Sequence, residues 1–393
     1  MCIKKYLKHY TKCVVEKLNY FCDRAFVNFI YKNMDLSKKY VFVDLSLIGD
    51  VLVSLPYYEK FFREIPDNDI QLVSLPITTN IFKKLIPNVV SINPFKFKYN
   101  PYYRINILKK IGRCECCAIT HPNRTKNMEY LCLKINSRYK IAYKGEYIYE
   151  IERKNPPLNL FSHIINNPYC NEKIVHISKH LKVFFEDLNY ILFNKYKNFS
   201  ISKNDYYTTF KKFNENLYTL DLKEKYNCDK YIVILTDAST PYRKYPSKDW
   251  QIILNNLPKD IKIIQIGLNK FPLKHPNLID LTGKTTLDET MLIVMNSSLV
   301  IGNETGLTHL GYLSGVPTVC ILGGGHFGRF LPWPEFEDIV KCVYEPMDCF
   351  QCGWKCKYVD LRKGEVPPCI SQIPPESVLT AIEKLNELYK IFP

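Results

Sequence analysis

Short apolar runs alternate with amphipathic stretches along most of the chain. Residues 40–45 have the continuous apolar character of a buried strand, and the spacing over 51–63 predicts a helix. A turn at 66–69 leads to a second predicted strand at 70–74, and further apolar runs follow at 89–92, 117–120 and 140–143. Strand, helix and strand in this order, joined by short turns, are typical of a parallel α/β sheet.

The same alternation begins again after residue 230. Strands are predicted at 231–235, 261–266, 299–301 and 318–322, and helices at 250–257 and 287–295. Between the two series, 150–175 predicts an irregular loop and 180–193 a strong helix, whereas 194–229 is polar, lysine-rich and weakly patterned. Two such series predict two Rossmann-like domains that face each other across a cleft, with ligands at the carboxyl ends of the strands.

We therefore predict an α/β protein with three parts. They are an N-terminal basic helical extension (1–38), a first Rossmann-like domain (39–205) and a second one (206–393) that includes a cysteine-rich loop (349–369). The extension has apolar residues at near-helical spacing over 3–32, with lysines between them. Such a helix either packs on its own domain or lies on an anionic membrane surface.

Composition narrows the class of partner. The 393 residues are 46% hydrophobic and carry a formal net charge of +15. This charge fits phosphorylated substrates, an anionic membrane surface or nucleic acid. Because Lys and Arg are dispersed rather than gathered in one strip, we predict no nucleic-acid partner. The sequence has no apolar run of about 18 residues and no signal-peptide pattern, so we expect a cytoplasmic protein.

The most informative segment surrounds a predicted turn at 302–306. The apolar run at 299–301 ends in Gly302, and Thr305 and Gly306 then open a predicted helix. The first amides of a helix have no internal partner and lie at the positive end of its dipole, so they bind phosphate well. A second glycine-rich turn follows the next strand, at 323–328. The segment predicts a site for a phosphorylated, nucleotide-linked ligand.

Two further segments carry polar groups directly after predicted strands. Asp50 follows a strand and a glycine at the start of a helix, where a carboxylate serves either as a general base or as an ordinary helix N-cap. Ser239 follows the first strand of the second series, with Arg243 and Lys244 nearby. These three residues either bind a diphosphate or belong to a solvated basic loop.

The sequence has two patterns that resemble metal sites. Asp67 and Asp69 have the spacing of an Asp-x-Asp pair, but their place between helix and strand predicts turn residues instead. The second pattern is a cluster of four cysteines, Cys349, Cys352, Cys356 and Cys369. Four thiolates suit structural zinc or iron, although the spacing is not that of a standard zinc ribbon. Reduced or partly disulfide-bonded cysteines are the alternative.

Taken together, four segments resemble glycosyltransferase family 9, the bacterial lipopolysaccharide heptosyltransferases and their relatives. Residues 47–56 are similar to the family's N-terminal Gly-Asp-Val-Leu…Pro motif, and 238–250 to its Gly-Ala-Ser…Lys-x-Trp-Pro segment. Residues 280–287 and 302–309 resemble its central donor-site motif, and the cysteine cluster with the closing helix resembles the C-terminus of many members. The four segments occur in the family's order.

The resemblance implies a GT-B fold and inverting transfer of a sugar from a nucleotide-diphospho-sugar, in the family typically ADP-heptose. The acceptor is then a hydroxyl of the lipopolysaccharide core, another glycan, a lipid-linked acceptor or a protein. Asp50 lies at the position of the family's proposed general base. The positions that match the donor site are Ser239, Arg243, Lys244, Asn303, Glu304, Thr305, Gly306 and His309.

The resemblance also bears on cofactors and location. The family needs no metal for its chemistry, and some relatives carry iron on cysteines, which implies structural iron or zinc at the cysteine cluster. An enzyme of this kind is expected in the cytoplasm, with possible peripheral contact at the inner face of the plasma membrane.

Several departures from the family pattern concern the donor. Arg243 replaces a lysine, Glu304 replaces an aspartate, and the triple-glycine turn at 323–328 replaces a Phe-Gly-Pro turn. After Gly267 no acidic residue follows where a ribose-binding glutamate is expected, and Asn269 is the nearest substitute. The alternatives are a sugar-nucleotide epimerase or hydrolase of the same fold, a non-catalytic sugar-nucleotide binder and a metal-stabilised nucleic-acid-binding protein.

Overall fold

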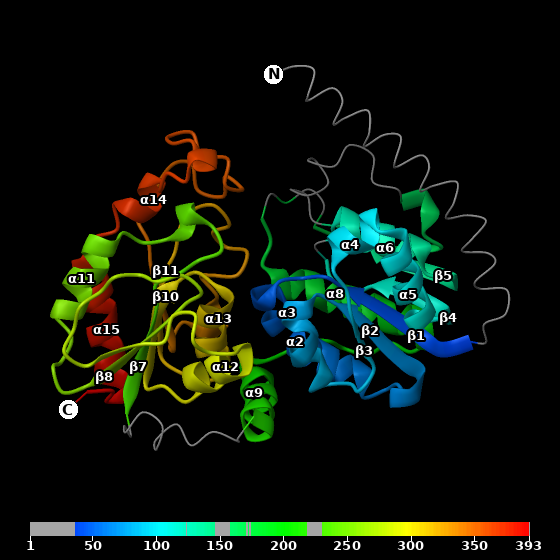
Figure 1. The fold of residues 1–393 in the computed structure, drawn as a ribbon, viewed down its shortest axis with the longest axis horizontal. Coiled ribbons are helices and arrows are strands. Elements are labelled where there is room, and N and C mark those ends of the chain that lie inside the picture. The colour runs from blue at the N-terminus through cyan, green and yellow to red at the C-terminus, as the bar shows by residue number, and fades with distance from the viewer. Residues whose placement is uncertain are drawn as a thin grey trace. The chain divides into compact units, whose positions relative to one another are not determined.

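The computed structural model describes residues 36–122, 124–145, 158–169, 172, 174–217 and 230–392 (Figure 1). It divides into two compact units. Unit 1 comprises Met1–Ser46 and Phe62–Pro168, and unit 2 comprises Leu47–Phe61 and Tyr169–Pro393. The predicted basic helix at 3–32 lies outside the described residues.

Unit 1 contains a six-stranded sheet in which neighbouring strands are parallel. Its strands are β1 (Leu36–Asp44), β2 (Ile70–Ser74), β3 (Val89–Ser91), β4 (Arg113–Ile119), β5 (Ser137–Tyr143) and β6 (His163–Ile165). Its helices are α3 (Pro76–Lys83), α4 (Pro94–Tyr99), α5 (Pro101–Ile111) and α6 (Lys126–Lys134), with short 3-10 turns η1 (Asp67–Asp69) and η2 (Leu158–Leu160). Apolar side chains of β1 and β4 pack against α4, α5 and α6 and form the core of this unit.

Unit 2 contains a second parallel sheet of six strands. They are β7 (Tyr231–Leu235), β8 (Lys262–Ile266), β9 (Leu278–Asp280), β10 (Leu299–Asn303), β11 (Thr318–Ile321) and β12 (Val340–Val343). Its helices are α2 (Ile48–Phe62), α8 (Ile177–Phe193), α9 (Lys203–Leu217), α11 (Ser247–Asn255), α12 (Leu287–Met295), α13 (Gly306–Leu313), α14 (Pro368–Ser371) and α15 (Pro375–Tyr389). Short 3-10 turns are η3 (Pro241–Arg243), η4 (Pro334–Phe336) and η5 (Leu361–Lys363).

The two sheets have the same strand order. It runs β3-β2-β1-β4-β5-β6 in unit 1 and β9-β8-β7-β10-β11-β12 in unit 2, which is the Rossmann order in both cases. In such a sheet the strand order reverses between the first and fourth strands, and ligands bind at the carboxyl ends of these strands. In unit 2 this point lies between β7 and β10. The predicted α/β class with two Rossmann-like parts is confirmed.

Helices cover both faces of the unit 2 sheet. On one face, Ile232 and Ile234 of β7 are fully buried together with side chains of α11, α14 and α15. On the other face α13 lies so close that a Cβ added to Gly311 would be 3.1 Å from Val300 of β10. Both faces are therefore shielded, as expected for strands that are apolar at every position.

Helix α2 packs within unit 2, although it directly follows β1 in the chain. Tyr206 of α9 donates a 2.7 Å hydrogen bond from its hydroxyl to the carbonyl oxygen of Val53. Phe185 of α8 lies against Tyr57 and Phe61, with ring centroids 5.9 and 5.5 Å apart. Helix α2, which carries Asp50, is thus fixed by aromatic packing against α8 and α9.

The predicted strands and helices of both series are present, but several elements were not predicted, among them β9, β12 and helices α3 to α6. Helix α9 lies in the polar stretch 194–229, and β6 lies in the predicted loop 150–175. Asp67 and Asp69 form η1, in agreement with the predicted turn. Within the described ranges, no helix is both long and apolar enough to cross a membrane.

Candidate functional site

A fully buried asparagine holds the loop that follows β7 against the end of β10. Asn303, the last residue of β10, donates from Nδ2 to the carbonyl oxygen of Thr236 at 2.8 Å. Its Oδ1 accepts from the backbone amide of Tyr245 at 3.0 Å. The loop 236–245, which carries Ser239, Arg243 and Lys244, is therefore tied to the carboxyl end of β10. In the structure Asn303 thus links the two ends of this loop to the end of β10.

Helix α13 begins at Gly306, as the sequence predicts. Thr305 is its N-cap in extended conformation and makes no capping bond to the helix amides. Thr308 Oγ1 donates to the carbonyl oxygen of Asn303 at 2.5 Å and contacts Thr305 Oγ1 at 3.2 Å. The first amides of α13 are thus not occupied by their own N-cap side chain, which is the arrangement that anion binding at a helix start requires.

Two helix starts approach each other closely at this place. A Cβ added to Gly306 would lie 2.7 Å from the backbone nitrogen of Gly49 and 3.1 Å from its Cα. Gly49 belongs to the first turn of α2, where Asp50 also lies. Asp50 lies inside the first turn of α2, whereas an N-cap residue precedes its helix, so Asp50 is not the N-cap of α2. The positive ends of two helix dipoles converge here.

Arg243 and Glu304, two of the departures from the family pattern, bind each other. Nη2 of Arg243 donates to Oε2 of Glu304 at 2.9 Å and to its carbonyl oxygen at 2.7 Å. The side chain of Glu304 is 4% exposed and that of Arg243 is 23% exposed. Burial raises the pKa of Glu304, and the positive charge of Arg243 opposes that rise. The guanidinium of Arg243, in place of a lysine, thus reaches both the carboxylate and the carbonyl oxygen of Glu304, which is longer than the usual aspartate.

Arg329 lies beside Asp50, and sequence analysis did not identify it. Its Nη1 is 3.5 Å from Oδ1 of Asp50, and its guanidinium stacks 4.4 Å from the ring centre of Phe330. The side chain of Arg329 is 5% exposed. It follows the glycine-rich turn 323–328, so the turn brings a buried cation to the carboxylate. A single arginine after that turn was the only signal in the sequence.

His309 is buried in the third position after the α13 start and is held in the neutral form. Burial, and after it the positive charge of Arg243, lowers its pKa to about 3. Its Nδ1 is 2.9 Å from the hydroxyl of Tyr312. The charge of Asp50 acts on both His309 and Glu304, which shows that these groups share one electrostatic environment.

The other predicted donor residues lie at the rim. Ser239 is exposed. Lys244 pairs with Oδ1 of Asp237 at 2.6 Å, while Oδ2 of Asp237 accepts from the amides of Leu268 and Asn269. Burial of Asp237 favours a higher pKa, but the hydrogen bonds from Lys244 and from the amides of Asn269 and Ala238, together with the charge of Lys244, outweigh it and the pKa is lowered. Asp237 therefore links the ends of β7 and β8 at the position where a ribose-binding glutamate was expected.

The cysteine-rich loop packs directly on the triple-glycine turn. A Cβ added to Gly323 would lie 2.8 Å from Cδ1 of Ile370, and one added to Gly325 would lie 2.7 Å from Nε1 of Trp354. At Gly324 the ring of Phe350 occupies the same space. The three glycines thus replace bulkier residues because the loop leaves no room for a side chain.

The four predicted metal ligands do not form a metal site as they are placed. Cys349, Cys352 and Cys356 lie close enough to Cys369 to raise its pKa by their charge, after the larger effect of burial. All four are free thiols. Among the described residues, no three His, Cys, Asp or Glu side chains are arranged to hold a metal ion. The geometry therefore does not support the predicted iron or zinc.

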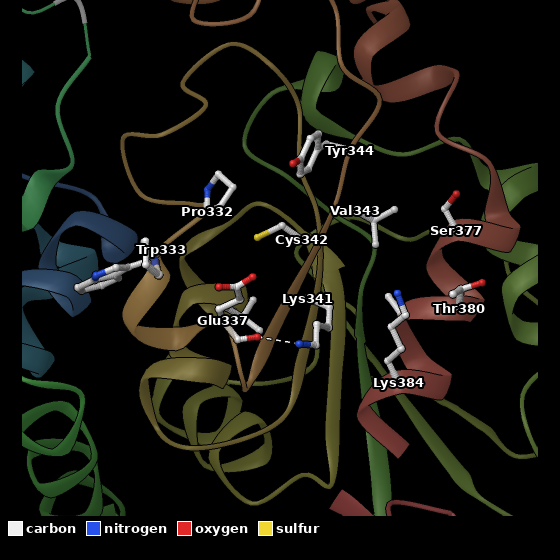
Figure 2. Close-up of a pocket in the computed structure, with 13 residues that line it drawn as sticks. Pro332, Trp333, Glu337, Lys341, Cys342, Val343, Tyr344, Ser377, Thr380 and Lys384 are labelled. Carbon is white, nitrogen blue, oxygen red and sulfur yellow. Dashed lines mark hydrogen bonds between the residues drawn. The ribbon is translucent and has the colours of Figure 1, made fainter. Parts of the chain in front are cut away.

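A separate hollow lies beside the edge strand β12 (Figure 2). Its volume is about 680 Å³, and its walls come from β12, α15 and the segment 332–337. Lys341 donates to the carbonyl oxygen of Glu337 at 2.8 Å within it. None of the residues predicted to bind the donor lines this hollow.

Solved structures with a similar fold include heptosyltransferases. E. coli heptosyltransferase WaaC with ADP is 15% identical, with a TM-score of 0.60 over 90% of this chain and 100% of that chain. E. coli ADP-heptose LPS heptosyltransferase II is 12% identical, with a TM-score of 0.58 over 90% and 99%. A family 9 glycosyltransferase from Veillonella parvula is 16% identical, with a TM-score of 0.58 over 89% and 98%. The fold is that of the GT-B heptosyltransferases.

The sequence profile of glycosyltransferase family 9 (heptosyltransferase) matches residues 159–358, about half of the chain. The chain therefore belongs to glycosyltransferase family 9. A search of curated proteins gives no significant match.

Proposed function

We propose that the protein is an inverting glycosyltransferase that moves a sugar from a nucleotide-diphospho-sugar to an acceptor hydroxyl. Asp50 takes the proton of the acceptor hydroxyl as its oxygen attacks the anomeric carbon. A new carbon–oxygen bond forms while the bond from the anomeric carbon to the diphosphate breaks, and the nucleoside diphosphate leaves with the electron pair. Family membership and the GT-B fold support this reaction class.

One observation carries the proposal: a carboxylate and a helix start whose amides are not capped by the N-cap side chain lie together in unit 2. The first turn of α2, with Asp50, contacts the first turn of α13 at Gly49 and Gly306. A base beside a phosphate site is what a displacement reaction needs, because the anomeric carbon links the phosphate to the incoming hydroxyl. Arg329, close to Asp50, keeps positive charge next to this carboxylate.

The leaving diphosphate is stabilised by groups that are already fixed in place. We assign this role to the α13 amides with Thr305, to Arg243 and to the rim residues Ser239 and Lys244. Donors that are held before the reaction lower the barrier because they need no reorganisation as charge develops. Glu304 fixes the Arg243 guanidinium, and His309, neutral at physiological pH, adds no charge of its own.

For the substrates we propose ADP-heptose as donor and a lipopolysaccharide-core, lipid-linked or protein hydroxyl as acceptor. The similar E. coli structures are described as heptosyltransferases, one of them with ADP and one with ADP-2-deoxy-2-fluoro heptose. We place the reaction in the cytoplasm, with an acceptor that could bring the enzyme to the inner membrane surface.

A thermal-shift screen over nucleotide-diphospho-sugars tests the proposal. A ligand at about 100 times its Kd stabilises the native state by about 2.7 kcal/mol, so a true donor raises Tm selectively. The selected donor is then incubated with acceptor and the glycosylated product is measured. Donor consumption without acceptor would favour an epimerase or hydrolase, and donor binding without any turnover would favour a non-catalytic binder; either result contradicts the transferase.

A further inference from the structure

The contact between the cysteine-rich loop and the triple-glycine turn is built at several points. Gln351 donates its backbone amide to the carbonyl oxygen of Gly324 at 2.7 Å, and Gly353 donates to Gly325 at 2.9 Å. Gln351 and Trp354 have φ of 65° and 61°, a left-handed conformation that costs energy for residues other than glycine. Backbone strain of this kind persists only where surrounding contacts enforce it.

Trp354, one of these two strained residues, carries an indole ring that lies on the triple-glycine turn. Trp354 packs on Gly325, and its ring centre lies 5.7 Å from Cζ of Arg243, within the range of a cation–π contact. The rings of Tyr242 and His326 lie 5.2 and 6.1 Å from it. Trp354 is only half-buried, so this small aromatic group next to Arg243 retains a surface open to ligand.

The turn also connects this aromatic group to the carboxylate. It contacts Trp354 at Gly325 and continues to Arg329, which lies beside Asp50. In the proposed reaction the diphosphate lies at Arg243 and the base at Asp50. The donor sugar is bonded to the diphosphate and reacts with the hydroxyl that Asp50 deprotonates, so it must lie along this turn. A flat apolar ring there meets the C–H face of a sugar rather than a phosphate.

We propose that Trp354 is a specificity-determining residue that contacts the sugar ring of the donor. The inference rests on the proposed function and goes beyond it, because it assigns the cysteine-rich loop to the donor site. The cysteine-rich loop carries the Trp354 ring, the triple-glycine turn leaves space for it, and Arg243 holds it by a cation–π contact beside the diphosphate.

Intrinsic fluorescence tests this contact. The chain has three tryptophans, of which Trp250 is 0% and Trp333 4% exposed, so Trp354 is the most exposed of the three, and it lies next to Arg243. We expect the sugar-nucleotide selected in the donor screen to change the tryptophan emission more strongly than the matching nucleoside diphosphate. Replacement W354F should remove the change while binding persists. An equal change with both ligands would place the nucleobase, not the sugar, on Trp354 and overturn the proposal.

Kinetics of two variants provide the second test. W354A should raise the donor KM roughly threefold to tenfold, as expected for loss of an aromatic contact, whereas the Kd for the nucleoside diphosphate stays within about twofold. W354F should restore most of the donor affinity. G325A should have the same effect as W354A in the wild-type background and little effect in the W354A background, because the atoms nearest to the added methyl belong to the indole.

The possible failures are distinguishable. If no sugar-nucleotide binds the wild-type protein, the proposed function itself is wrong. If the wild-type protein transfers sugar and W354A retains an unchanged donor KM and kcat, the transferase stands and the role of Trp354 is wrong. Variant F350L is the matched control: it alters packing of the same loop on Gly324 but leaves Trp354 in the chain. An equal rise of KM in F350L and W354A would show a general loop effect and contradict the specific contact.

Discussion

The Arg243–Glu304 pair gives the sharpest quantitative prediction. Arg243→Met removes a guanidinium that binds Oε2 and the carbonyl oxygen of Glu304, whose side chain is 4% exposed. Removing one partner of a buried ion pair costs about 3–5 kcal/mol. Because Arg243 is itself 23% exposed, we expect the lower end of this range. Glu304→Gln keeps an acceptor for the arginine and should cost about 1.5–2 kcal/mol, at the low end of the usual range for a hydrogen bond to a charged group.

The cost of Arg243→Met should depend on pH. Burial already raises the pKa of Glu304, and Arg243 opposes this rise, so its removal raises the pKa further. A carboxyl with a folded pKa above its unfolded value contributes stability at low pH that is lost as pH rises through the folded pKa. The destabilisation should therefore shrink on acidification, by at most about 1.4 kcal/mol per pH unit.

Urea unfolding followed by tryptophan fluorescence measures these costs, because all three tryptophans belong to unit 2. The double variant should be less destabilised than the sum of the single variants by about 2 kcal/mol. A matched control is Arg124→Met, which breaks a buried pair with Glu129 in unit 1 and should leave nucleotide binding unchanged. Additive costs, or a cost of Arg243→Met that is the same at every pH, would refute the reasoning.

Three further predictions address the groups around this pair. Arg329→Gln should lower kcat roughly tenfold to a hundredfold by misplacing Asp50, with the donor KM nearly unchanged. In the Asp50→Asn background the same replacement should cause no further loss of kcat, and additive losses in steady-state kinetics would contradict this. Burial lowers the pKa of His176 to about 4. On acidification the unfolded chain therefore takes up the proton before the folded protein does, and the free energy of unfolding falls by about 3 kcal/mol from pH 6.5 to 4. His176→Gln should show a shallower fall in urea titrations, and an equal slope would refute the assignment. Gly306→Ala should destabilise unit 2 by about 1–3 kcal/mol and weaken binding of ADP in calorimetry, because its methyl meets the Gly49 backbone; a stabilised variant would exclude the close approach.

Local patterns were sufficient to predict most of the fold. Strand β7 is a continuous apolar run between turns, and parallel sheets bury both faces of such strands. The missed helix α9 has a polar composition and is held by packing against α12, α13 and α2, which no local pattern records. Tertiary contacts, rather than propensity, decide whether such a segment is helical.

The candidate site was predictable where function depends on backbone geometry. The helix start at Thr305 and Gly306 and the place of Asp50 after a strand follow from sequence alone. The pairing of Arg243 with Glu304 joins two substitutions that the sequence presents separately, and the proximity of Arg329 to Asp50 depends on how the glycine-rich turn folds. Likewise, the triple glycine is explained only by the aromatic residues that occupy its space.

The most direct test of the central claim compares the wild-type protein with Asp50→Asn in a single-turnover transfer assay with the donor selected by thermal shift. We predict that the variant binds the donor with a Kd within about twofold and loses at least about a hundredfold in transfer rate, as expected for removal of a general base. Asn keeps the shape of the side chain and removes its ability to take a proton. Undiminished transfer by this variant would contradict the assignment of Asp50 as the base and the mechanism built on it.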